Sequence, residues 1–300
     1  MHIAVLKGGP GREREVSLKS AEAVSAALRS VGARVTEVEV KDAEFDVPRS
    51  IDVAFNVIHG TFGEDGQLQR VLERSGIPYT GARVSSSERA FDKVISKKLF
   101  LKNDVPTPPY EVLALSRGQK PRMAPPFVLK PVREGSSVGV HIIREAGQIA
   151  AALEELREFG DDVLAEKFIS GRELTVGILG TEALPVVHIS PRDGFYDMNN
   201  KYPWMGGGGE TDYICPAEIG VSPTQKTQAA ALRAHRALGV EVYSRVDVLL
   251  DEHDNPIVLE VNTIPGMTAS SLLPKAAAAA GIDFPALCAR IVRLSLGLPP

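Results

Sequence analysis

The chain has 300 residues, of which 44% are hydrophobic and 24% are charged, and its formal net charge is −4. Such a composition is ordinary for a globular enzyme, and this length suits two or three domains that each have a core. The slightly acidic balance argues against nucleic acid as a partner, because nucleic-acid binding usually needs a basic face. No apolar stretch reaches the roughly 18 residues that a membrane-spanning helix requires, so we expect no membrane partner.

The start of the chain and its cysteines bear on the cellular compartment. Residues 1–6 are typical of a strand and lack the basic start and cleavage site of an export signal. Cys215 and Cys288 are too few for a disulfide scaffold, so a reducing compartment is expected. We therefore predict a cytoplasmic protein in which both cysteines are small buried apolar groups.

Strands and helices alternate over the first part of the chain. Apolar runs typical of strands cover residues 3–6, 34–40 and 51–58, and helical spacing follows Ser17, the predicted N-cap, and again residues 68–72. Gly32 is expected to end the first helix. This alternation predicts a parallel sheet covered by helices on both faces.

The pattern changes near residue 89. Ser85–Glu88 fits a capping box for a helix whose apolar side includes Ile95 and which leaves Lys93 and Lys97 on its surface. A small α+β unit follows, with strand-like runs at residues 127–130, 138–143 and 163–166 and a helix at residues 150–159. The remainder holds further strands, a long loop and two Ala-rich helices. We therefore predict domains at residues 1–88, 89–173 and 174–300.

The clearest chemical pattern lies near the C-terminus, where two strand-like runs flank a turn centred on residues 253 and 254. Such a hairpin places Asp247 opposite Glu260, and Arg245 opposite Asn262. Opposed carboxylates repel unless a cation lies between them, and these oxygen donors suit Mg²⁺ better than zinc. A solvated hairpin face with an incidental Arg–Asp pair explains the spacing equally well. The Pro-Gly turn within Thr263–Thr268 favours a site, because its N–H groups can face a bound anion.

A second pattern indicates phosphate binding without a Walker loop, since the chain contains no Gly-Lys dipeptide. Lys130 ends a predicted strand, and the flexible loop Glu134–Ser137 follows it. Lys93 adds another cation. Lys93 and Lys97 are four residues apart and repel each other in a helix, which a bound anion would relieve. Solvated surface lysines explain the same spacing.

The N-terminal loop Gly9–Arg14 excludes a nicotinamide dinucleotide. It contains the first two glycines of the dinucleotide fingerprint, but Arg14 replaces the third and Pro10 lacks an N–H. The charged residues Glu13–Glu15 suit a substrate ammonium, or else form an exposed helix start.

Together these patterns resemble the D-alanine–D-alanine ligases of the ATP-grasp superfamily over nearly the entire chain. The order and spacing of the matching stretches make the combination specific. These stretches are Leu6–Gly9 with Arg12–Ser17, His59–Gly60 with Gly63–Gly66, Pro78–Gly81, Asp92–Lys93, Lys130–Pro131 with Arg133–Gly139, Lys201–Tyr202, Arg245–Asp247, and Glu260–Thr263 with Pro265–Thr268.

The resemblance implies an α/β protein with an α+β central unit, an ATP-grasp fold and a Rossmann-like N-terminal domain with a parallel sheet. ATP would lie between the central and C-terminal domains. The implied ATP-binding residues are Lys93 and Lys130 at the phosphates, Ser137 in the loop above them, Glu166, Lys167, Phe168 and Ile169 at the adenine, Glu173 at the ribose, and Lys201 in a lid. Asp247, Glu260 and Asn262 would bind two Mg²⁺ or Mn²⁺ ions.

The resemblance also implies the reaction. The γ-phosphate of ATP moves to the carboxylate of one D-alanine, and the amine of a second attacks the acyl phosphate, giving D-alanyl-D-alanine for peptidoglycan synthesis. The implied catalytic residues are Glu13 with Ser136 and Tyr202, and Arg245 with the Gly266 N–H at the oxyanion. The implied substrate contacts are His59, Ser271 and Leu272. The family also implies a homodimer.

One stretch departs from the family pattern, and rival activities stay open. Residues 203–211 are longer and richer in glycine than in many relatives, which raises the entropy cost of ordering the lid. A D-alanine–D-lactate ligase of the same fold is the nearest rival, and Tyr202 favours the dipeptide. Another ATP-grasp carboxylate–amine ligase is a further alternative. The complete metal set argues against a non-catalytic nucleotide-binding module.

Overall fold

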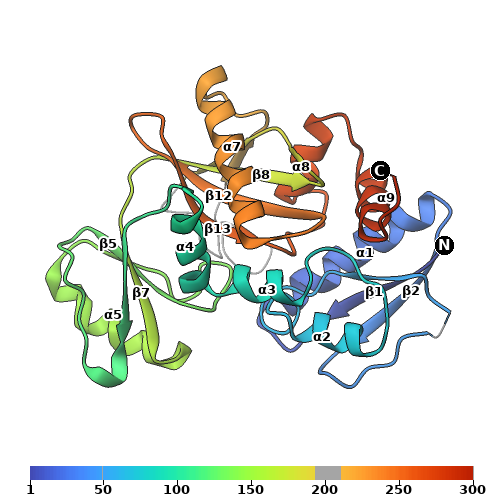
Figure 1. Ribbon diagram of the computed structural model, residues 1–300, viewed down its shortest axis with the longest axis horizontal. Helices are drawn as coiled ribbons and strands as arrows, with labels where there is room; N and C mark the ends of the chain where they lie inside the picture. Colours follow the sequence, from blue (N-terminus) through green and yellow to red (C-terminus); the bar gives the residue numbers. More distant parts are fainter. Residues whose placement is uncertain (49, 193–210, 300) are drawn as a thin grey trace.

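The computed structural model describes residues 1–48, 50–192 and 211–299, which fold into three sheets with helices packed on them. In chain order the elements are β1 (His2–Gly8), α1 (Arg14–Ser30), β2 (Arg34–Val40), β3 (Val53–Asn56), α2 (Gln67–Arg74), α3 (Val84–Phe91), α4 (Lys93–Lys102), β4 (Tyr110–Ala114), β5 (Phe127–Pro131), β6 (His141–Ile143), α5 (Ile149–Leu156), β7 (Asp162–Lys167), β8 (Arg172–Leu179), β9 (Glu182–Ala183), β10 (Val187–Pro191), β11 (Thr211–Ile214), α7 (Val221–Leu238), β12 (Tyr243–Leu250), β13 (Pro256–Asn262), α8 (Leu272–Ala279) and α9 (Phe284–Ser295). In Figure 1 the sheet of β1–β3 lies at the right, the sheet of β4–β7 at the left, and the sheet of β8–β13 above both.

The N-terminal sheet is parallel, with the strand order β2-β1-β3, as the alternating pattern predicts. Side chains of β1 alternate between two cores. Ile3 and Val5 pack with α1, and Ala4 and Leu6 pack with α2 on the opposite face. Helices therefore cover both faces of this sheet.

The first helix begins earlier than predicted. Glu13, not Ser17, occupies the N-cap position of α1. Ser17 is fully buried in the first turn, where its hydroxyl accepts a hydrogen bond of 2.9 Å from the Gly8 N–H. The hydroxyl therefore ties the helix to the end of β1, and Glu13 is placed at the end of the helix that faces the site.

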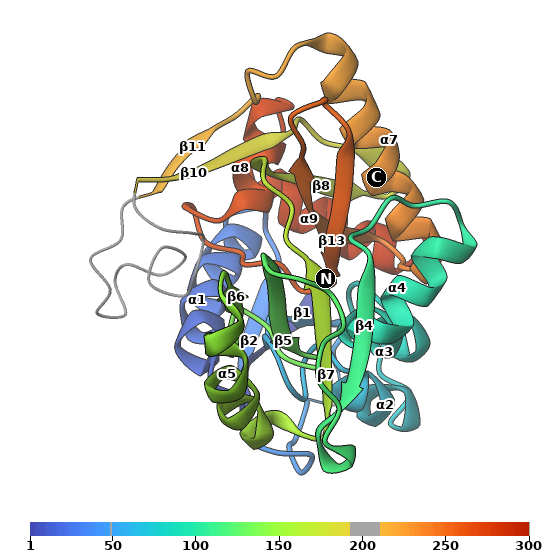
Figure 2. The ribbon, with the colours of Figure 1, turned by 90° about the vertical axis from the view of Figure 1, so that its left-hand side faces the viewer.

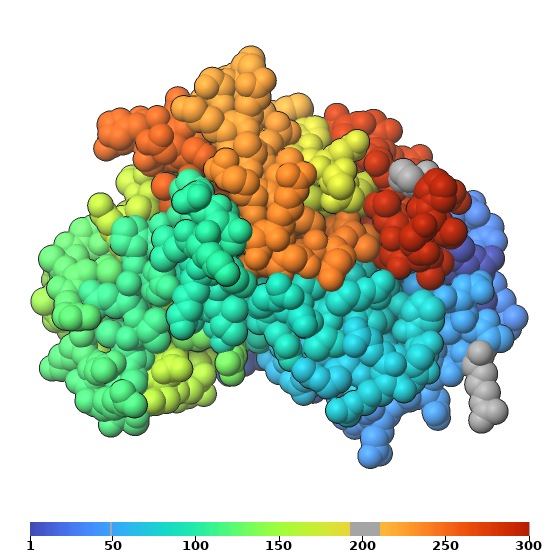
Figure 3. Space-filling view, viewed as in Figure 1, coloured from blue at the N-terminus to red at the C-terminus, as the bar shows by residue number. Residues whose placement is uncertain are grey.

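The single helix predicted from Ser85 onward is two helices, α3 and α4. Arg83 is the N-cap of α3, and Asp92 breaks the helical path and caps α4. The Asp92 carboxylate accepts hydrogen bonds of 3.0 Å from each of the next-turn N–H groups of Val94 and Ile95. Because this break turns α4 relative to α3, Ile95 is exposed and Lys97 is buried, the reverse of the prediction. On the face shown in Figure 3, α3 and α4 fill the junction at which the three sheets and their helices meet.

The central sheet is antiparallel, with the order β4-β7-β5-β6. Strands β5 and β7 and helix α5 lie where the apolar runs predict them, whereas β6 is shorter than the predicted run of residues 138–143. Figure 2 shows this sheet from the left-hand side of Figure 1, with α5 packed alongside. Lys130 therefore lies near the end of β5, an inner strand of this four-stranded sheet, and the predicted loop follows it toward β6.

The C-terminal sheet is also antiparallel, with the order β11-β10-β8-β12-β13 and with β9 paired to β8. Helix α7 packs on one face through a core that includes Val246 and Val248. Since strand side chains alternate, Arg245 and Asp247 project from the other face. Helices α8 and α9 follow, and α9 packs against α1, so the end of the chain shares a core with the N-terminal sheet.

The hairpin register is as predicted at the chemical residues. Arg245 pairs with Asn262, and Asp247 pairs with Glu260, with a bulge after Asp247. Both cysteines are free; Cys288 is buried as predicted, but Cys215 is only partly buried. Among the described residues no single helix is long and apolar enough to cross a membrane. Helices α8 and α9, which are bent by 101° relative to each other, meet this requirement only when taken together, and only by length and composition.

Candidate active site

Two adjoining pockets lie between the three sheets. The larger, of about 580 Å³, is bounded by β5–β8, β10 and the β12–β13 hairpin, and the smaller, of about 100 Å³, extends from it toward α1 and α8. Lys93, Glu134, Gly135 and Glu260 line both pockets, so the two spaces meet at these residues.

The sequence-predicted residues divide between the two pockets. The larger is lined by Lys93, Lys130, Ser137, Glu166, Lys167, Phe168, Ile169, Glu173, Asp247 and Glu260. The smaller is lined by Glu13, His59, Lys93, Ser136, Arg245, Glu260, Asn262, Gly266, Ser271 and Leu272. Lys201 and Tyr202 lie outside the described residues.

The hairpin carboxylates have cationic neighbours, as their opposition requires. The Arg245 Nε and Nη2 donate to Asp247 Oδ1 and Oδ2 at 2.9 and 2.7 Å. Thr175 Oγ1, from the adjacent strand β8, donates to Asp247 Oδ1 at 2.6 Å. Across the hairpin, Lys93 Nζ lies 3.9 Å from Glu260 Oε2. Each carboxylate therefore has a positive charge beside it from the protein itself.

The donor set nevertheless fits a hard divalent cation. Two opposed carboxylates and the amide of Asn262 supply oxygen ligands, the type that Mg²⁺ prefers together with phosphate oxygens. The Asn262 side chain is held by a hydrogen bond of 2.9 Å that Oδ1 accepts from the Ile264 N–H. Among the described residues no group of three or more His, Cys, Asp or Glu side chains could hold a metal ion by itself.

Of the two lysines predicted to lie on the helix surface, Lys97 is buried and Lys93 is partly buried, with 11% of its side chain exposed. Lys93 donates to the Glu134 carbonyl oxygen, and burial lowers the pKa of Lys93, partly offset by Glu260. Lys97 is 1% exposed and lies 2.8 Å from Glu166 Oε1. Burial lowers the pKa of Lys97 to about 8. Each lysine thus has its own carboxylate partner, Glu260 for Lys93 and Glu166 for Lys97.

Lys130 and the residues at the end of β7, Glu166–Ile169, line one side of the larger pocket. Lys130 Nζ lies 2.9 Å from Glu166 Oε2. Lys167 and Phe168 follow at the strand end, where the Lys167 N–H donates to the Pro109 carbonyl at 2.9 Å. The apolar wall comprises residues that the sequence analysis did not single out, among them Val128, Val140, Ile142 and Leu259. For Val140 and Ile142, the only indication in the sequence was their alternation within a predicted strand.

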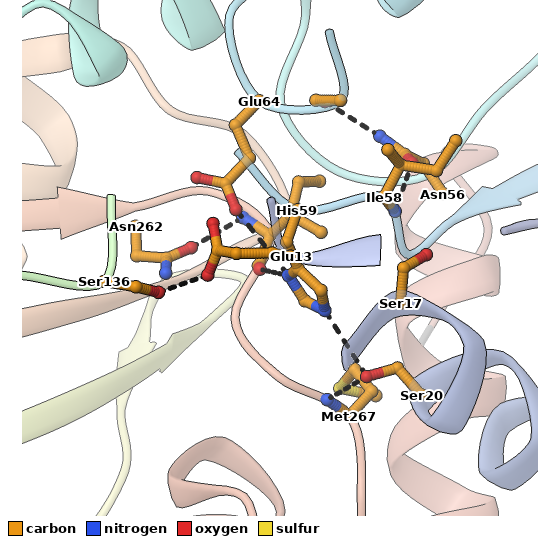
Figure 4. A network of polar contacts seen from close by, with 12 residues as sticks. Glu13, Ser17, Ser20, Asn56, Ile58, His59, Glu64, Ser136, Asn262 and Met267 are labelled. Atoms are coloured by element: carbon orange, nitrogen blue, oxygen red, sulfur yellow. Dashed lines mark hydrogen bonds and ion pairs between the residues drawn. The ribbon is translucent and has the colours of Figure 1, made fainter. Parts of the chain in front are cut away.

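A polar network links Glu13 to the central loop (Figure 4). The Ser136 hydroxyl donates to Glu13 Oε1, joining residues 123 positions apart. Ser136 and Ser137 both have positive φ, 50° and 60°, so the loop turns back over the pocket. A Cβ on Gly60 would lie 2.9 Å from Glu13 Oε2, so only glycine leaves room for this carboxylate.

His59 lies beneath that contact, between Glu64 and Ser20 (Figure 4). Its Nδ1 is 2.8 Å from the Ile264 carbonyl oxygen and 3.6 Å from Glu64 Oε1, and its Nε2 is 3.3 Å from Ser20 Oγ. Burial by itself lowers the pKa of His59, but the carboxylates of Glu64 and Glu13 reverse this effect and raise it. Burial also raises the pKa of Glu64. Glu64 lies within a matching stretch of the sequence, whereas nothing in the sequence pointed to Ser20.

The far wall of the smaller pocket is the start of α8. Ser271 is the N-cap of α8, so the Leu272 N–H belongs to the first turn, where N–H groups have no partner within the helix. The Ser271 hydroxyl accepts a hydrogen bond of 3.0 Å from the Thr268 N–H. A Cβ on Gly266 would lie 2.8 Å from Ser271 Oγ, so glycine allows the turn to approach the helix. This end of the pocket suits a carboxylate.

Comparison with known proteins gives a consistent result. The family model for the C-terminus of D-Ala–D-Ala ligases matches residues 99–293, and the model for the N-terminus matches residues 31–82. The chain is 49% identical over 294 residues to the D-alanine–D-alanine ligase of Methylacidiphilum infernorum, covering 98% of this chain and 95% of that protein. It is 44% identical to the enzyme of the same name from Citrifermentans bemidjiense, covering 97% and 95% of the two.

Solved structures agree. The D-alanine–D-alanine ligase of Bacillus anthracis complexed with ATP superposes with a TM-score of 0.85 at 31% identity, covering 99% of this chain and 98% of that chain. The VanG D-Ala:D-Ser ligase of Enterococcus faecalis superposes with a TM-score of 0.84 at 26% identity, covering 98% and 99%. The fold is therefore the one that these ligases share.

Proposed function

The chain belongs to the D-alanine–D-alanine ligase family, and from that premise we propose how its residues divide the work of the reaction. It is an ATP-dependent ligase of the ATP-grasp fold that joins two D-alanine molecules for peptidoglycan synthesis. The meeting of the two pockets at Lys93 and Glu260 carries the proposal, because a phosphoryl group has to pass from a nucleotide to an adjacent carboxylate.

ATP occupies the larger pocket. Lys93 and Lys130 face the phosphates, and the loop with Ser136 and Ser137 covers them. The adenine contacts Glu166, Lys167, Phe168 and Ile169, with apolar side chains on either side, and Glu173 contacts the ribose. Lys201 belongs to the same site but lies outside the described residues.

Asp247, Glu260 and Asn262 would hold two Mg²⁺ or Mn²⁺ ions, which suit this set of oxygen donors. When bound, these ions neutralise charge on the phosphate oxygens. The protein's own cations Lys93 and Arg245 already stand at the same carboxylates. These contacts hold both acids in place for the ions.

The two amino acids occupy the smaller pocket. The first D-alanine places its ammonium at Glu13, which Ser136 holds in position. Tyr202, predicted to act with these two residues, lies outside the described residues. The carboxylate of the second D-alanine binds Ser271 and the Leu272 N–H at the start of α8. His59 also lines this pocket and holds the turn before α8 through the Ile264 carbonyl. Facing carboxylate and ammonium sites orient the acceptor amine toward the activated carboxyl group.

Arg245 and the Gly266 N–H stabilise the oxyanion formed when the amine attacks. Both line the smaller pocket, on the side toward the hairpin. Water has to be excluded because it would hydrolyse the acyl phosphate. The lid predicted for this purpose, with Lys201 and Tyr202, lies outside the described residues.

The substrate assignment is tested by ADP release from the purified protein with ATP, Mg²⁺ and one of several acceptors. We expect release with D-alanine, little with L-alanine, and a preference for D-alanine over D-lactate at neutral pH. A preference for D-lactate would identify an ester-forming relative and contradict the proposal.

The metal assignment is tested by Glu260→Ala, which should abolish ADP release while leaving the circular dichroism spectrum unchanged. Glu252→Ala is the matched control, because Glu252 is an exposed residue in the turn of the same hairpin. Turnover that survives in Glu260→Ala shows that the metal assignment is wrong.

We also propose three domains at residues 1–88, 89–173 and 174–300. The three separate sheets support this division, although the two boundaries fall within α3 and β8. A cytoplasmic location follows from the need for ATP. The enzyme is proposed to be a homodimer, and sedimentation equilibrium measures its mass.

A further inference from the structure

Lys97 is a fully buried lysine that the reaction described above does not use. Its side chain is 1% exposed, and its Nζ lies 2.8 Å from Glu166 Oε1. Nζ also donates to Thr107 Oγ1 at 2.8 Å and to the Pro108 carbonyl oxygen at 3.3 Å, and it stands 5.3 Å from the centre of the Tyr110 ring. An ionised lysine in such a place is costly unless it is paired, and a buried pair is weak evidence for added stability. Stability alone therefore does not explain a lysine at this position, which suggests a role in ligand binding.

Glu166 connects Lys97 to the nucleotide pocket. Its side chain is 4% exposed, and its second oxygen, Oε2, lies 2.9 Å from Lys130 Nζ. Glu166 on β7 pairs with Val128 on β5, so Lys130, two residues further along β5, shares its face of the sheet. Within the described residues Lys97 lines neither pocket, whereas Glu166 and Lys130 line the larger one. Lys97 thus reaches the larger pocket through two partners, the carboxylate of Glu166 and the carbonyl of Pro108, and of these only Glu166 carries a charge.

The charges of the three side chains matter for an anionic ligand. If Lys97 were absent, Glu166 would pair with Lys130 alone, and the charge of Lys130 would be balanced within the protein. With Lys97 present, the carboxylate is shared between two ammonium groups, and the cluster keeps one positive charge more than it has negative. Coulombic attraction from both lysines opposes burial and holds the pKa of Glu166 below its usual value.

We propose that Lys97 is a positioning residue for the nucleotide: it holds Glu166 from behind and leaves Lys130 with an unbalanced positive charge for the phosphates of ATP. This inference rests on the proposed role of Lys130 at the phosphates. It predicts that the charge of Lys97 matters for a phosphorylated ligand and hardly matters for the nucleoside alone.

The experiment compares the affinities of ATP and adenosine by isothermal titration calorimetry for Lys97→Met, Lys97→Arg and Lys98→Met. Lys97→Met should raise the Kd for ATP about tenfold to a hundredfold, the usual effect of losing a charge-assisted contact, and change the Kd for adenosine far less. Lys97→Arg keeps the charge and should restore most of the ATP affinity. Lys98→Met is the matched control, since Lys98 is exposed on the same helix, and should bind as the parent does.

A double variant separates charge from packing. Lys97→Met with Glu166→Gln removes both buried charges and leaves Lys130 unbalanced again. Because Glu166 also contacts the adenine, the affinity for ATP is compared with that for adenosine, and this ratio should recover relative to Lys97→Met. Recovery cannot come from repaired packing, because the cavity around position 97 is the same in both. If Lys97→Met alone does not fold, Lys97→Arg and the double variant still carry the comparison with the parent.

Two results overturn the inference: equal losses for ATP and adenosine in Lys97→Met, or a double variant no better than Lys97→Met. Lys130→Met distinguishes this failure from failure of the proposed function. If Lys130→Met binds ATP as the parent does, the phosphate role of Lys130 is wrong. If Lys130→Met loses ATP while Lys97→Met keeps it, only the role of Lys97 is wrong.

Discussion

The bidentate contact of Arg245 with Asp247 allows a prediction that separates stability from catalysis. The side chains of the pair are 14% and 11% exposed, and both nitrogen–oxygen distances are below 3 Å. Arg245→Met keeps most of the apolar stem and removes the guanidinium. Asp247 then retains the Thr175 hydroxyl but faces Glu260 across the hairpin without the charge of Arg245.

The expected loss of stability lies between two limits. Removing one partner of a buried ion pair costs about 3–5 kcal/mol, whereas an exposed pair contributes about 0.2–1 kcal/mol. Because this pair is nearly buried and Thr175 remains, we expect Arg245→Met to lower the free energy of unfolding by about 2–4 kcal/mol. Turnover should fall about 10²–10³-fold, since a donor to the oxyanion is lost.

Urea unfolding followed by circular dichroism measures the first quantity, and coupled ADP release measures the second. Arg172→Met is the control: Arg172 pairs with Asp254 at 2.9 Å on the same sheet, but the two side chains are 43% and 47% exposed. The control should lose less than about 1 kcal/mol. Adding Mg²⁺ should narrow the stability gap for Arg245→Met only, because a bound cation replaces the missing charge.

Equal destabilisation by the two substitutions would refute the reasoning from burial. Parental turnover in Arg245→Met would refute the role at the oxyanion even if stability falls as expected.

Two further predictions concern the fold. Burial lowers the pKa of His235 to about 4, and its Nδ1 is 2.8 Å from Ser244 Oγ. Only the unfolded chain binds this proton between pH 6.5 and 4, so stability is full above pH 6.5 and falls as the pH falls, by up to about 3 kcal/mol. His235→Gln should flatten the pH profile of the urea midpoint across that window, and an unchanged slope would assign the acid sensitivity to other groups. Gly63→Ala places a Cβ 1.9 Å from the Ile58 carbonyl oxygen, so it should destabilise the protein by about 2–3 kcal/mol. The control is Gly147→Ala, whose Cβ would meet nothing within 4 Å and which should leave stability unchanged. Thermal unfolding of both variants measures the difference.

The sequence by itself determined the parts of this protein that depend on short-range periodicity. Alternation along two strands and the length of one turn were enough to place Asp247 opposite Glu260 and Arg245 opposite Asn262. The succession of strands and helices was enough for the parallel N-terminal sheet. The order of the motifs identified the family, and both pockets collect the described residues that the motifs named.

Only the tertiary structure decided which polar groups are buried and what they face. The spacing of Lys93 and Lys97 was compatible with a solvated helix surface, but the break at Asp92 turns α4 so that Lys97 meets Glu166 on a distant strand. His59 contacts the Ile264 carbonyl across 205 residues, and no local pattern could pair them. Periodicity indicates which side chains share a face, whereas the partner of a buried charge depends on how whole elements pack. That packing places Lys97 against Glu166, behind the nucleotide pocket.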